Sequence, residues 1–329
     1  MTARILSYAE AIREAFSQML SRDERVFVIG QGVRSPWYVG TSMQDLDKEF
    51  GPDRIIDSPV SENATTGAAL GAAVAGMRPI VIHPRMDFML LAVDQIVNQA
   101  ANWFYMSGGR VCAPITVRAI VNRGGEQGAQ HSQSVHAWFM HVPGLKVVMP
   151  STPYDAKGLL IASIQDDNPV LYFDDRWLYD ERSHVPEEPY VVPIGKAALR
   201  RKGRDVTIVS VSLMAREAMA AARALEARKI DVEVIDLRSL SPLDKDLICT
   251  SLSKTGRLVT ADGGWLTAGI GAEIASLAAG AAYRSLKAPV RHVSLPDVPA
   301  PMSKTLESAF YPTSHDVVRA VEEVMEFHL

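Results

Sequence analysis

The chain has 329 residues, of which 47% are hydrophobic and 22% charged, and its formal net charge is -4 at pH 7. The length allows two domains with full cores, and the lack of a basic excess argues against a nucleic-acid partner. No uninterrupted apolar run reaches the ~18 residues that a membrane span needs. The two cysteines are too few for a disulfide framework, and the first residues lack an apolar signal segment. We therefore expect a cytoplasmic protein.

Short apolar runs alternate with helical patterns through the first half of the chain. Ser7 and Glu10 form a capping-box pattern in front of an apolar helical face. Strands covered on both faces are expected at residues 26–29, 80–82, 115–117 and 147–149. This alternation predicts an α/β fold with a mostly parallel sheet.

Glu62 stands directly before residues 64–76, a stretch without charge that is built mostly from Ala and Gly. Gly67 and Gly71 are four apart, a spacing that lets a helix pack closely against its surroundings, so we expect this helix to be buried. A carboxylate at the start of such a helix is either a favourable helix-end charge or a functional acid. Taken alone, the residues favour the first interpretation.

Phe88 follows the strand at 80–82 and a polar turn at residues 83–87. An aromatic residue there either packs into a core or stacks on a bound ring, because ligands of open parallel sheets bind beyond the carboxyl ends of the strands.

Residues 122–133 are the densest polar stretch, and His131 within it is the candidate acid/base. His136 and His141 follow at five-residue intervals, a spacing that does not suit a metal cluster on one helix face, so both are expected to be structural. The chain has no Gly-x-Ser-x-Gly elbow of a serine hydrolase.

Residues 174–193 are rich in charge and proline, which is typical of a linker. We place the domain boundary there, giving domains 1–185 and 186–329. The second domain repeats the alternation, with strands expected at 206–211, 232–237, 258–260 and 290–293 and helices at 214–227 and 270–279. Residues 269–274 match a dinucleotide fingerprint only weakly, and a tight turn leading into a helix explains them better.

Four segments, residues 57–62, 128–133, 142–159 and 236–244, carry a close resemblance to a known family. The chain resembles the β subunit of the thiamine-diphosphate-dependent first component of 2-oxo-acid dehydrogenases, of the pyruvate, branched-chain and acetoin type. The likeness covers nearly the whole chain. It implies two doubly wound domains with mostly parallel sheets: a transketolase-like pyrimidine-binding domain and a C-terminal domain that forms a subunit interface.

The resemblance implies a role for each candidate residue. Glu62 would hydrogen-bond the N1′ atom of the aminopyrimidine of thiamine diphosphate, Phe88 would stack on that ring, and His131 would handle protons at the substrate. The implied reaction is decarboxylation of a 2-oxo acid with acyl transfer to a lipoyl carrier.

Two other functions stay open. A split transketolase-like enzyme would transfer an acyl or ketol unit to an aldehyde or ketone, such as that of a sugar, and would use Glu62 in the same way. A non-catalytic partner-binding subunit is disfavoured because Glu62, Phe88 and His131 are all present.

The family also implies metal ions and partners. Residues 261–264 read Ala-Asp-Gly-Gly, which is not the Gly-Asp-Gly motif that holds diphosphate and Mg²⁺ in this superfamily. An α subunit should therefore hold them in an α2β2 heterotetramer, with a lipoyl-bearing acyltransferase as a possible further partner. Five backbone carbonyls correspond to a potassium site of the family: those of Ile115, Ser163, Ile164, Asp166 and Asn168. A capped helix end at residues 166–169 explains the same turn without an ion.

Arg85 and Asp87 depart from the family, which tends to have apolar or aromatic residues just before the stacking Phe. A charged pair beside Phe88 indicates a polar or anionic substrate. The alternative is a mutual surface salt bridge, which would contribute less than ~1 kcal/mol.

Overall fold

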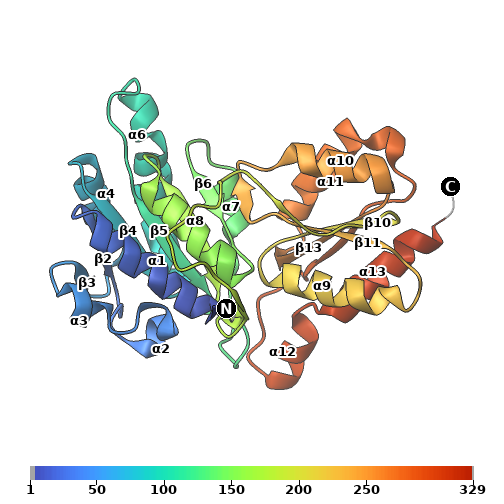
Figure 1. Ribbon diagram of the computed structural model, residues 1–329, viewed down its shortest axis with the longest axis horizontal. Coiled ribbons are helices and arrows are strands. Elements are labelled where there is room, and N and C mark those ends of the chain that lie inside the picture. The colour runs from blue at the N-terminus through green and yellow to red at the C-terminus, as the bar shows by residue number, and fades with distance from the viewer. Residues whose placement is uncertain (1–3, 328–329) are drawn as a thin grey trace. The chain divides into compact units, whose positions relative to one another are not determined.

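The computed structural model describes residues 4–327, and contacts divide this part of the chain into two compact units (Figure 1). The first unit extends to Arg123 and resumes over Trp138–Ile194, whereas the second contains Gly124–Ala137 and the chain from Gly195 onwards. This division falls a few residues after the boundary that we propose between residues 185 and 186. No helix in the described range is long and apolar enough to cross a membrane.

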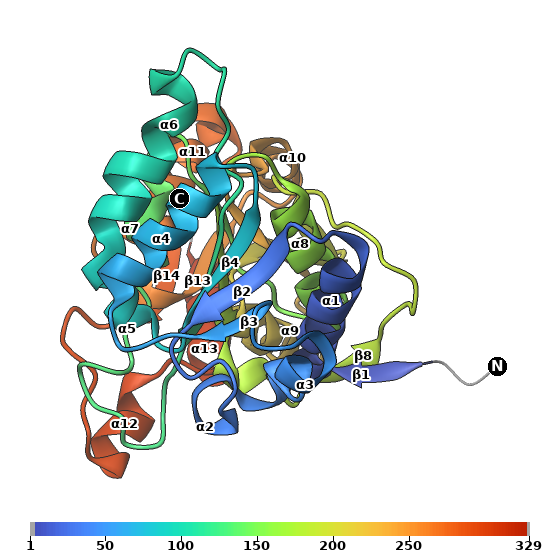
Figure 2. The same cartoon turned by 90° about the vertical axis from the view of Figure 1, so that its left-hand side faces the viewer.

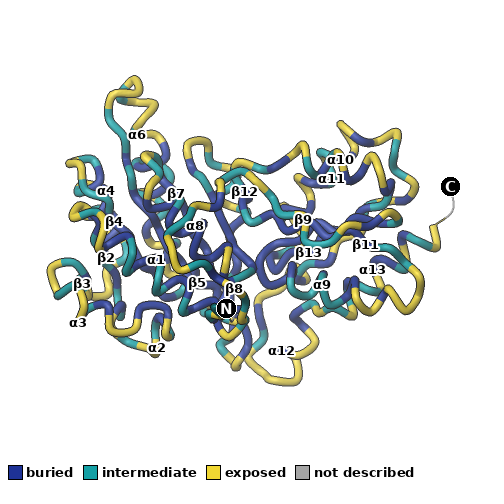
Figure 3. Tube along the Cα trace, viewed as in Figure 1, coloured by how far each residue is buried: buried dark blue, intermediate teal, exposed yellow. Residues whose placement is uncertain are grey.

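The first unit is built on a parallel sheet in the order β6-β7-β5-β4-β2-β3. Every residue of β5 and β7 is buried, as expected for strands covered on both faces (Figure 3). The four strands predicted for this half are all present, as β2, β4, β5 and β6, and the sheet contains β3 and β7 in addition. The strands are β2 (Val26–Gly30), β3 (Ile55–Asp57), β4 (Arg78–His83), β5 (Thr116–Val121), β6 (Lys146–Val148) and β7 (Val170–Asp175).

Helices cover both faces of this sheet. The helices α1 (Tyr8–Arg22) and α8 (Pro153–Gln165) contact each other on one face, and α4 (Glu62–Val74) lies on the opposite face (Figure 2). The capping box of Ser7 and Glu10 at the start of α1 is confirmed. Shorter elements are α2 (Pro36–Val39), η1 (Gly40–Met43), α3 (Leu46–Phe50), α5 (Met86–Met89), η2 (Leu90–Ala92), η3 (Asp94–Ala100), α6 (Ala101–Met106), α7 (His136–Met140) and η4 (Arg176–Leu178), with the antiparallel pair β1 (Ile5–Ser7) and β8 (Arg182–His184).

The start of the predicted linker belongs to the sheet. Asp174 and Asp175 end β7 and are fully buried. Asp174 accepts two hydrogen bonds of 2.8 Å from Arg118, and Asp175 forms a 2.8 Å ion pair with Arg123. Burial alone would lower the pKa of Arg118, but the nearby Asp174 and Tyr179 outweigh it and raise that pKa. We interpreted these charged residues as part of a linker because their partners, Arg118 and Arg123, lie more than fifty residues away in the sequence.

The second unit contains a sheet in the order β14-β13-β10-β11-β9, parallel except for β9. Its helices α9 and α13 contact each other, as do α10 and α11, and the two pairs cover opposite faces (Figure 1). Gly269 is the N-cap of α11, so the turn that leads into a helix is confirmed. The elements are β9 (Ala198–Arg201), β10 (Val206–Ser210), α9 (Leu213–Glu226), β11 (Val232–Asp236), β12 (Ser239–Ser241), α10 (Lys245–Thr255), β13 (Leu258–Trp265), α11 (Ile270–Ala281), η5 (Tyr283–Ser285), β14 (Arg291–Leu295), α12 (Lys304–Phe310) and α13 (Ser314–Glu326).

Both units therefore have a mostly parallel sheet with helices on each face, and the predicted fold class is confirmed. The core of the second unit packs valines of β10, β11 and β13 against α9 and α13.

Candidate active site

A shallow depression in the first unit lies where the strands β2, β3 and β4 end and α4 begins. In the sheet, β3 and β4 lie on opposite sides of β2, so the strand order reverses at β2. Open α/β sheets bind ligands at such a switch point, beyond the carboxyl ends of the strands. Its floor is tight, since a Cβ atom on Gly30 would lie 2.4 Å from the carbonyl oxygen of Ile82. The lining residues are Gly30, Gln31, Ser58, Pro59, Ser61, Glu62, Thr65, Ile82, His83 and Pro84.

Glu62 is the first residue of α4, and it is half-buried at the edge of this depression. The preceding Ser61 makes no side-chain capping bond, so the Glu62 carboxylate is the acidic group of the first turn and is favoured by the helix dipole. The expectation that the following helix is buried holds for one of its faces only. Ala64, Ala68 and Gly71 are exposed in the isolated chain, because the small residues meet no neighbour on that face.

His83 is a site residue that the sequence interpretation missed. It ends β4, is fully buried, and its Nε2 lies 3.2 Å from the hydroxyl oxygen of Thr66 on α4. Burial lowers the pKa of His83 to about 4, so the ring is neutral at pH 7. A histidine at the end of the apolar run Ile80–Ile82 was the available signal, because a polar ring inside such a strand needs a buried partner.

Phe88 lies on α5, just after β4, and 36% of its surface is exposed. Its backbone N–H donates to the carbonyl oxygen of Arg85 at 3.2 Å. Asp87 is buried and Arg85 is half-buried, and the described residues show no ion pair between them. The alternative of a mutual surface salt bridge is therefore absent from the structure.

His131 lies in a loop that is held by the second unit. The backbone N–H of Glu126 donates to the carboxylate of Glu307, and His136 contacts Asp262 of β13 at 3.0 Å. The hydroxyl of Ser134 lies 3.0 Å from the other ring nitrogen of His136. Glu62, Phe88, Arg85 and Asp87 thus belong to the first unit, whereas His131 belongs to the second.

The comparisons with known proteins decide the family. Residues 5–181 match the transketolase pyrimidine binding domain, and residues 195–317 match the transketolase C-terminal domain. The β subunit of acetoin:2,6-dichlorophenolindophenol oxidoreductase from Bacillus subtilis is 41% identical over 335 residues, which cover 98% of each chain. The pyruvate dehydrogenase E1 component subunit β of Rickettsia felis is 43% identical over 319 residues, covering 97% of this chain and 98% of that protein.

The chain belongs to the transketolase-like E1 β-subunit family. The resemblance inferred from the sequence is therefore confirmed. A solved split-gene transketolase, described as an inactive β4 tetramer, superposes with a TM-score of 0.78 at 23% identity and covers 98% of this chain and 99% of its own. At that identity the superposition supports the fold.

In this E1 β-family chain, two of the five carbonyls expected to bind potassium accept hydrogen bonds from an arginine. One guanidinium nitrogen of Arg78 donates to the carbonyl oxygens of Ile164 and Asp166, both at 3.1 Å. The carbonyl of Ile115 accepts from the N–H of Val170, and that of Ser163 accepts from the N–H of Asp166. Each carbonyl oxygen can accept a second bond or coordinate a cation, so the set is compatible with potassium.

The Ala-Asp-Gly-Gly run at residues 261–264 lies inside β13 of the second unit. Asp262 of the Ala-Asp-Gly-Gly run is buried in β13 against His136. Among the described residues, no group of three His, Cys, Asp or Glu side chains could hold a metal ion.

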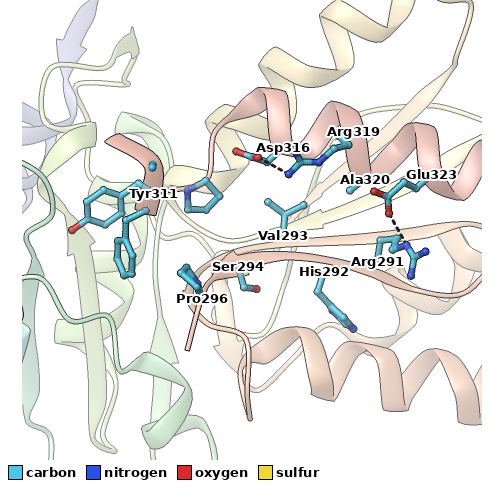
Figure 4. Close-up of a pocket in the computed structure, with 13 residues that line it drawn as sticks. Arg291, His292, Val293, Ser294, Pro296, Tyr311, Asp316, Arg319, Ala320 and Glu323 are labelled. Carbon is cyan, nitrogen blue, oxygen red and sulfur yellow. Dashed lines mark hydrogen bonds and ion pairs between the residues drawn. The ribbon is translucent and has the colours of Figure 1, made fainter. Parts of the chain in front are cut away.

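Another hollow lies in the second unit, between β14 and α13 (Figure 4). Its two arginines are each paired with a carboxylate, Arg291 with Glu323 at 2.8 Å and Arg319 with Asp316 at 2.9 Å. Because these charges are compensated, this hollow does not resemble a site built for an ionic ligand.

Proposed function

We propose that this chain is the β subunit of a thiamine-diphosphate-dependent 2-oxo-acid dehydrogenase, which decarboxylates a 2-oxo acid and passes the acyl group to a lipoyl carrier. The observation that carries the proposal is the position of Glu62. Its carboxylate lines the depression at the ends of β2 and β4, inside the segment that matches a pyrimidine-binding domain. The names of the E1 relatives support the same reaction class.

Thiamine diphosphate, when bound, would supply the centre that attacks the 2-oxo acid and accepts the electron pair left by CO₂. Glu62 would hold a proton at the N1′ atom of the aminopyrimidine, which is the role that its place in the depression suits. Phe88 would offer its exposed ring for stacking. His131 would exchange a proton with the substrate.

The chain lacks the Gly-Asp-Gly motif that holds diphosphate and Mg²⁺ in this superfamily, so the proposed enzyme needs a partner subunit. An α subunit would hold the diphosphate and Mg²⁺, giving an α2β2 heterotetramer that works in the cytoplasm, with a lipoyl-bearing acyltransferase as acyl acceptor. Large exposed apolar side chains in the first unit, Trp37, Leu91, Tyr105, Met106 and Trp138, are consistent with surfaces that a partner covers.

The variant Glu62→Gln tests the role of the carboxylate. Reconstituted with an α subunit, thiamine diphosphate and Mg²⁺, it should lose at least about a hundred-fold in kcat, because Gln retains the shape but cannot hold the proton. The unfolding temperature should match wild type. Glu24→Gln, an exposed residue just before β2, is the matched control and should keep full activity. Activity of Glu62→Gln within a few-fold of wild type would contradict the proposal.

We also propose that potassium binds among the carbonyls of Ile115, Ser163, Ile164, Asp166 and Asn168. The convergence of two of these oxygens on Arg78 supports the site, while the positive charge of Arg78 limits its affinity. At a concentration one hundred times Kd, potassium would stabilise the folded chain by about 2.7 kcal/mol. The unfolding temperature should therefore be higher in potassium chloride than in choline chloride of equal ionic strength. Equal unfolding temperatures in the two salts would show that Arg78, without potassium, holds the carbonyls of Ile164 and Asp166.

A further inference from the structure

Arg85 lies two residues after the end of β4, and most of its hydrogen-bonding capacity is unused. One N–H donates to the carbonyl oxygen of Pro84 at 3.0 Å. Its Nε is buried and has no hydrogen-bond partner, and none of the described carboxylates lies within ion-pair distance of its guanidinium. A half-buried guanidinium with unused donors is costly unless an acceptor reaches it.

A second arginine, Arg176, lies close to Arg85 and is held rigidly. It follows β7 and donates to the carbonyl oxygens of Pro36, Trp37 and Tyr38 at 3.1–3.3 Å. All of these acceptors are neutral, so they fix the guanidinium without compensating its charge. This role was not predicted, because Arg176 falls within residues 174–193, which we interpreted as a linker.

Asn122, at the end of β5, connects the two arginines. Its Nδ2 donates to the carbonyl oxygen of Pro84 at 3.1 Å, the same oxygen that Arg85 contacts. Its Oδ1 accepts from Arg176 at 3.3 Å. One buried amide therefore lies between the two guanidinium groups, at the carboxyl ends of three neighbouring strands.

The electrostatics of this cluster favour an anion. Burial and the charge of Arg176 lower the pKa of Arg85, which Asp87 offsets only in part. Asp87 is the acid that acts on Arg85, and the nearby Arg123 is paired with Asp175. Two guanidinium charges against one carboxylate leave a net charge of about +1, and a guanidinium binds carboxylate or phosphate with two parallel bonds.

We infer that Arg85, with the fixed charge of Arg176 behind it, binds an anionic group of the substrate, a carboxylate or a phosphate. The inference rests on the proposed function and deepens it. Pro84 lines the depression that contains Glu62, so Arg85 lies one residue from that lining. The cluster therefore selects substrates that carry negative charge at the end away from the reacting carbon.

The reacting carboxylate of the 2-oxo acid is a poorer candidate for this cluster. It loses its charge as CO₂ leaves, so tight binding by two arginines would stabilise the ground state more than the transition state and slow the reaction. A second, distal anion keeps its charge throughout, and its binding does not oppose the chemistry.

The test compares matched substrates with the reconstituted αβ enzyme. As donors, 2-oxoglutarate and 2-oxopentanoate have the same chain length and differ in the terminal carboxylate. A second donor pair, phosphohydroxypyruvate and hydroxypyruvate, consists of two 2-oxo acids that differ in a terminal phosphate. Wild type should prefer the anionic member of one pair, and that pair identifies whether the group is a carboxylate or a phosphate. Arg85→Met should reduce kcat/KM for that member by about ten- to a hundred-fold and leave the neutral member within two-fold.

Arg85→Lys should retain part of the preference, because lysine keeps the positive charge but cannot make the two parallel hydrogen bonds of a guanidinium. Arg25→Met is the control: it is the same substitution at an arginine that precedes β2, at the amino ends of the strands. It should leave kcat/KM unchanged for both members of each pair. Equal turnover of both members by wild type, or an equal loss for both in Arg85→Met, would overturn the anion site. Glu62→Gln, measured in the same preparations, separates the two proposals. If it abolishes activity while the Arg85→Met result contradicts the anion site, only the anion site is rejected and the proposed function stands.

Discussion

At the scale of single residues, His83 couples the candidate site to pH. Burial lowers its pKa to about 4, from the ordinary value of 6.5 that applies in the unfolded chain. Between these two values the unfolded state binds more protons than the folded state, so stability is lost as the pH falls through this window. The loss would approach about 3 kcal/mol below pH 4.

The variant His83→Gln tests this coupling, since Gln can still bond Thr66 but does not titrate. Denaturant unfolding of wild type between pH 7 and pH 4 should show a steeper fall in the free energy of unfolding than the variant shows. His141→Gln, an exposed histidine, should behave as wild type. Parallel curves for wild type and His83→Gln would mean that His83 does not control this loss. Partly buried His292, whose pKa is also lowered by burial, contributes in the same direction in all three proteins.

At the scale of elements, a buried pair of side chains helps to hold the loop that carries His131. His136 and Asp262 are 3.0 Å apart and almost fully inaccessible to solvent. His136→Ala would leave a buried carboxylate without this partner, so it should destabilise the second unit by a few kcal/mol and increase hydrogen exchange in residues 124–137. The double variant His136→Asp, Asp262→His should recover part of the stability by restoring the pair. Unchanged exchange in His136→Ala would show that Glu307 alone holds the loop.

The elements that the sequence predicted and those it missed differ in the range of their interactions. The strand at Val26–Gly30 and the helix that starts at Tyr8 depend on local periodicity and capping, and both were predicted. The attachment of the loop at 124–137 depends on Asp262 and Glu307, more than one hundred residues away, and no local pattern encodes it. Arg176 was missed for the same reason, since its four acceptors lie elsewhere in the sequence.

At the scale of the whole molecule, residues 5–181 match a transketolase pyrimidine binding domain, and we propose that the chain provides only this side of the cofactor site while an α subunit holds the diphosphate and Mg²⁺. We therefore expect no turnover by the isolated chain at any concentration of thiamine diphosphate and Mg²⁺. Activity should appear when an α subunit is added, and should saturate at one α per β if the assembly is α2β2. The measurement is a titration of activity together with the mass of the complex in solution.

The Glu62→Gln chain separates assembly from catalysis in this titration. Glu62 contributes a carboxylate to the depression, whereas the partner-covered surfaces proposed above are apolar, so the variant should form a complex of the same mass without activity. Added in excess to wild type, it should compete for the α subunit and lower the activity in proportion to its share of the β chains. Turnover by the wild-type chain alone, or failure of Glu62→Gln to compete, would contradict a catalytic site that two different subunits complete.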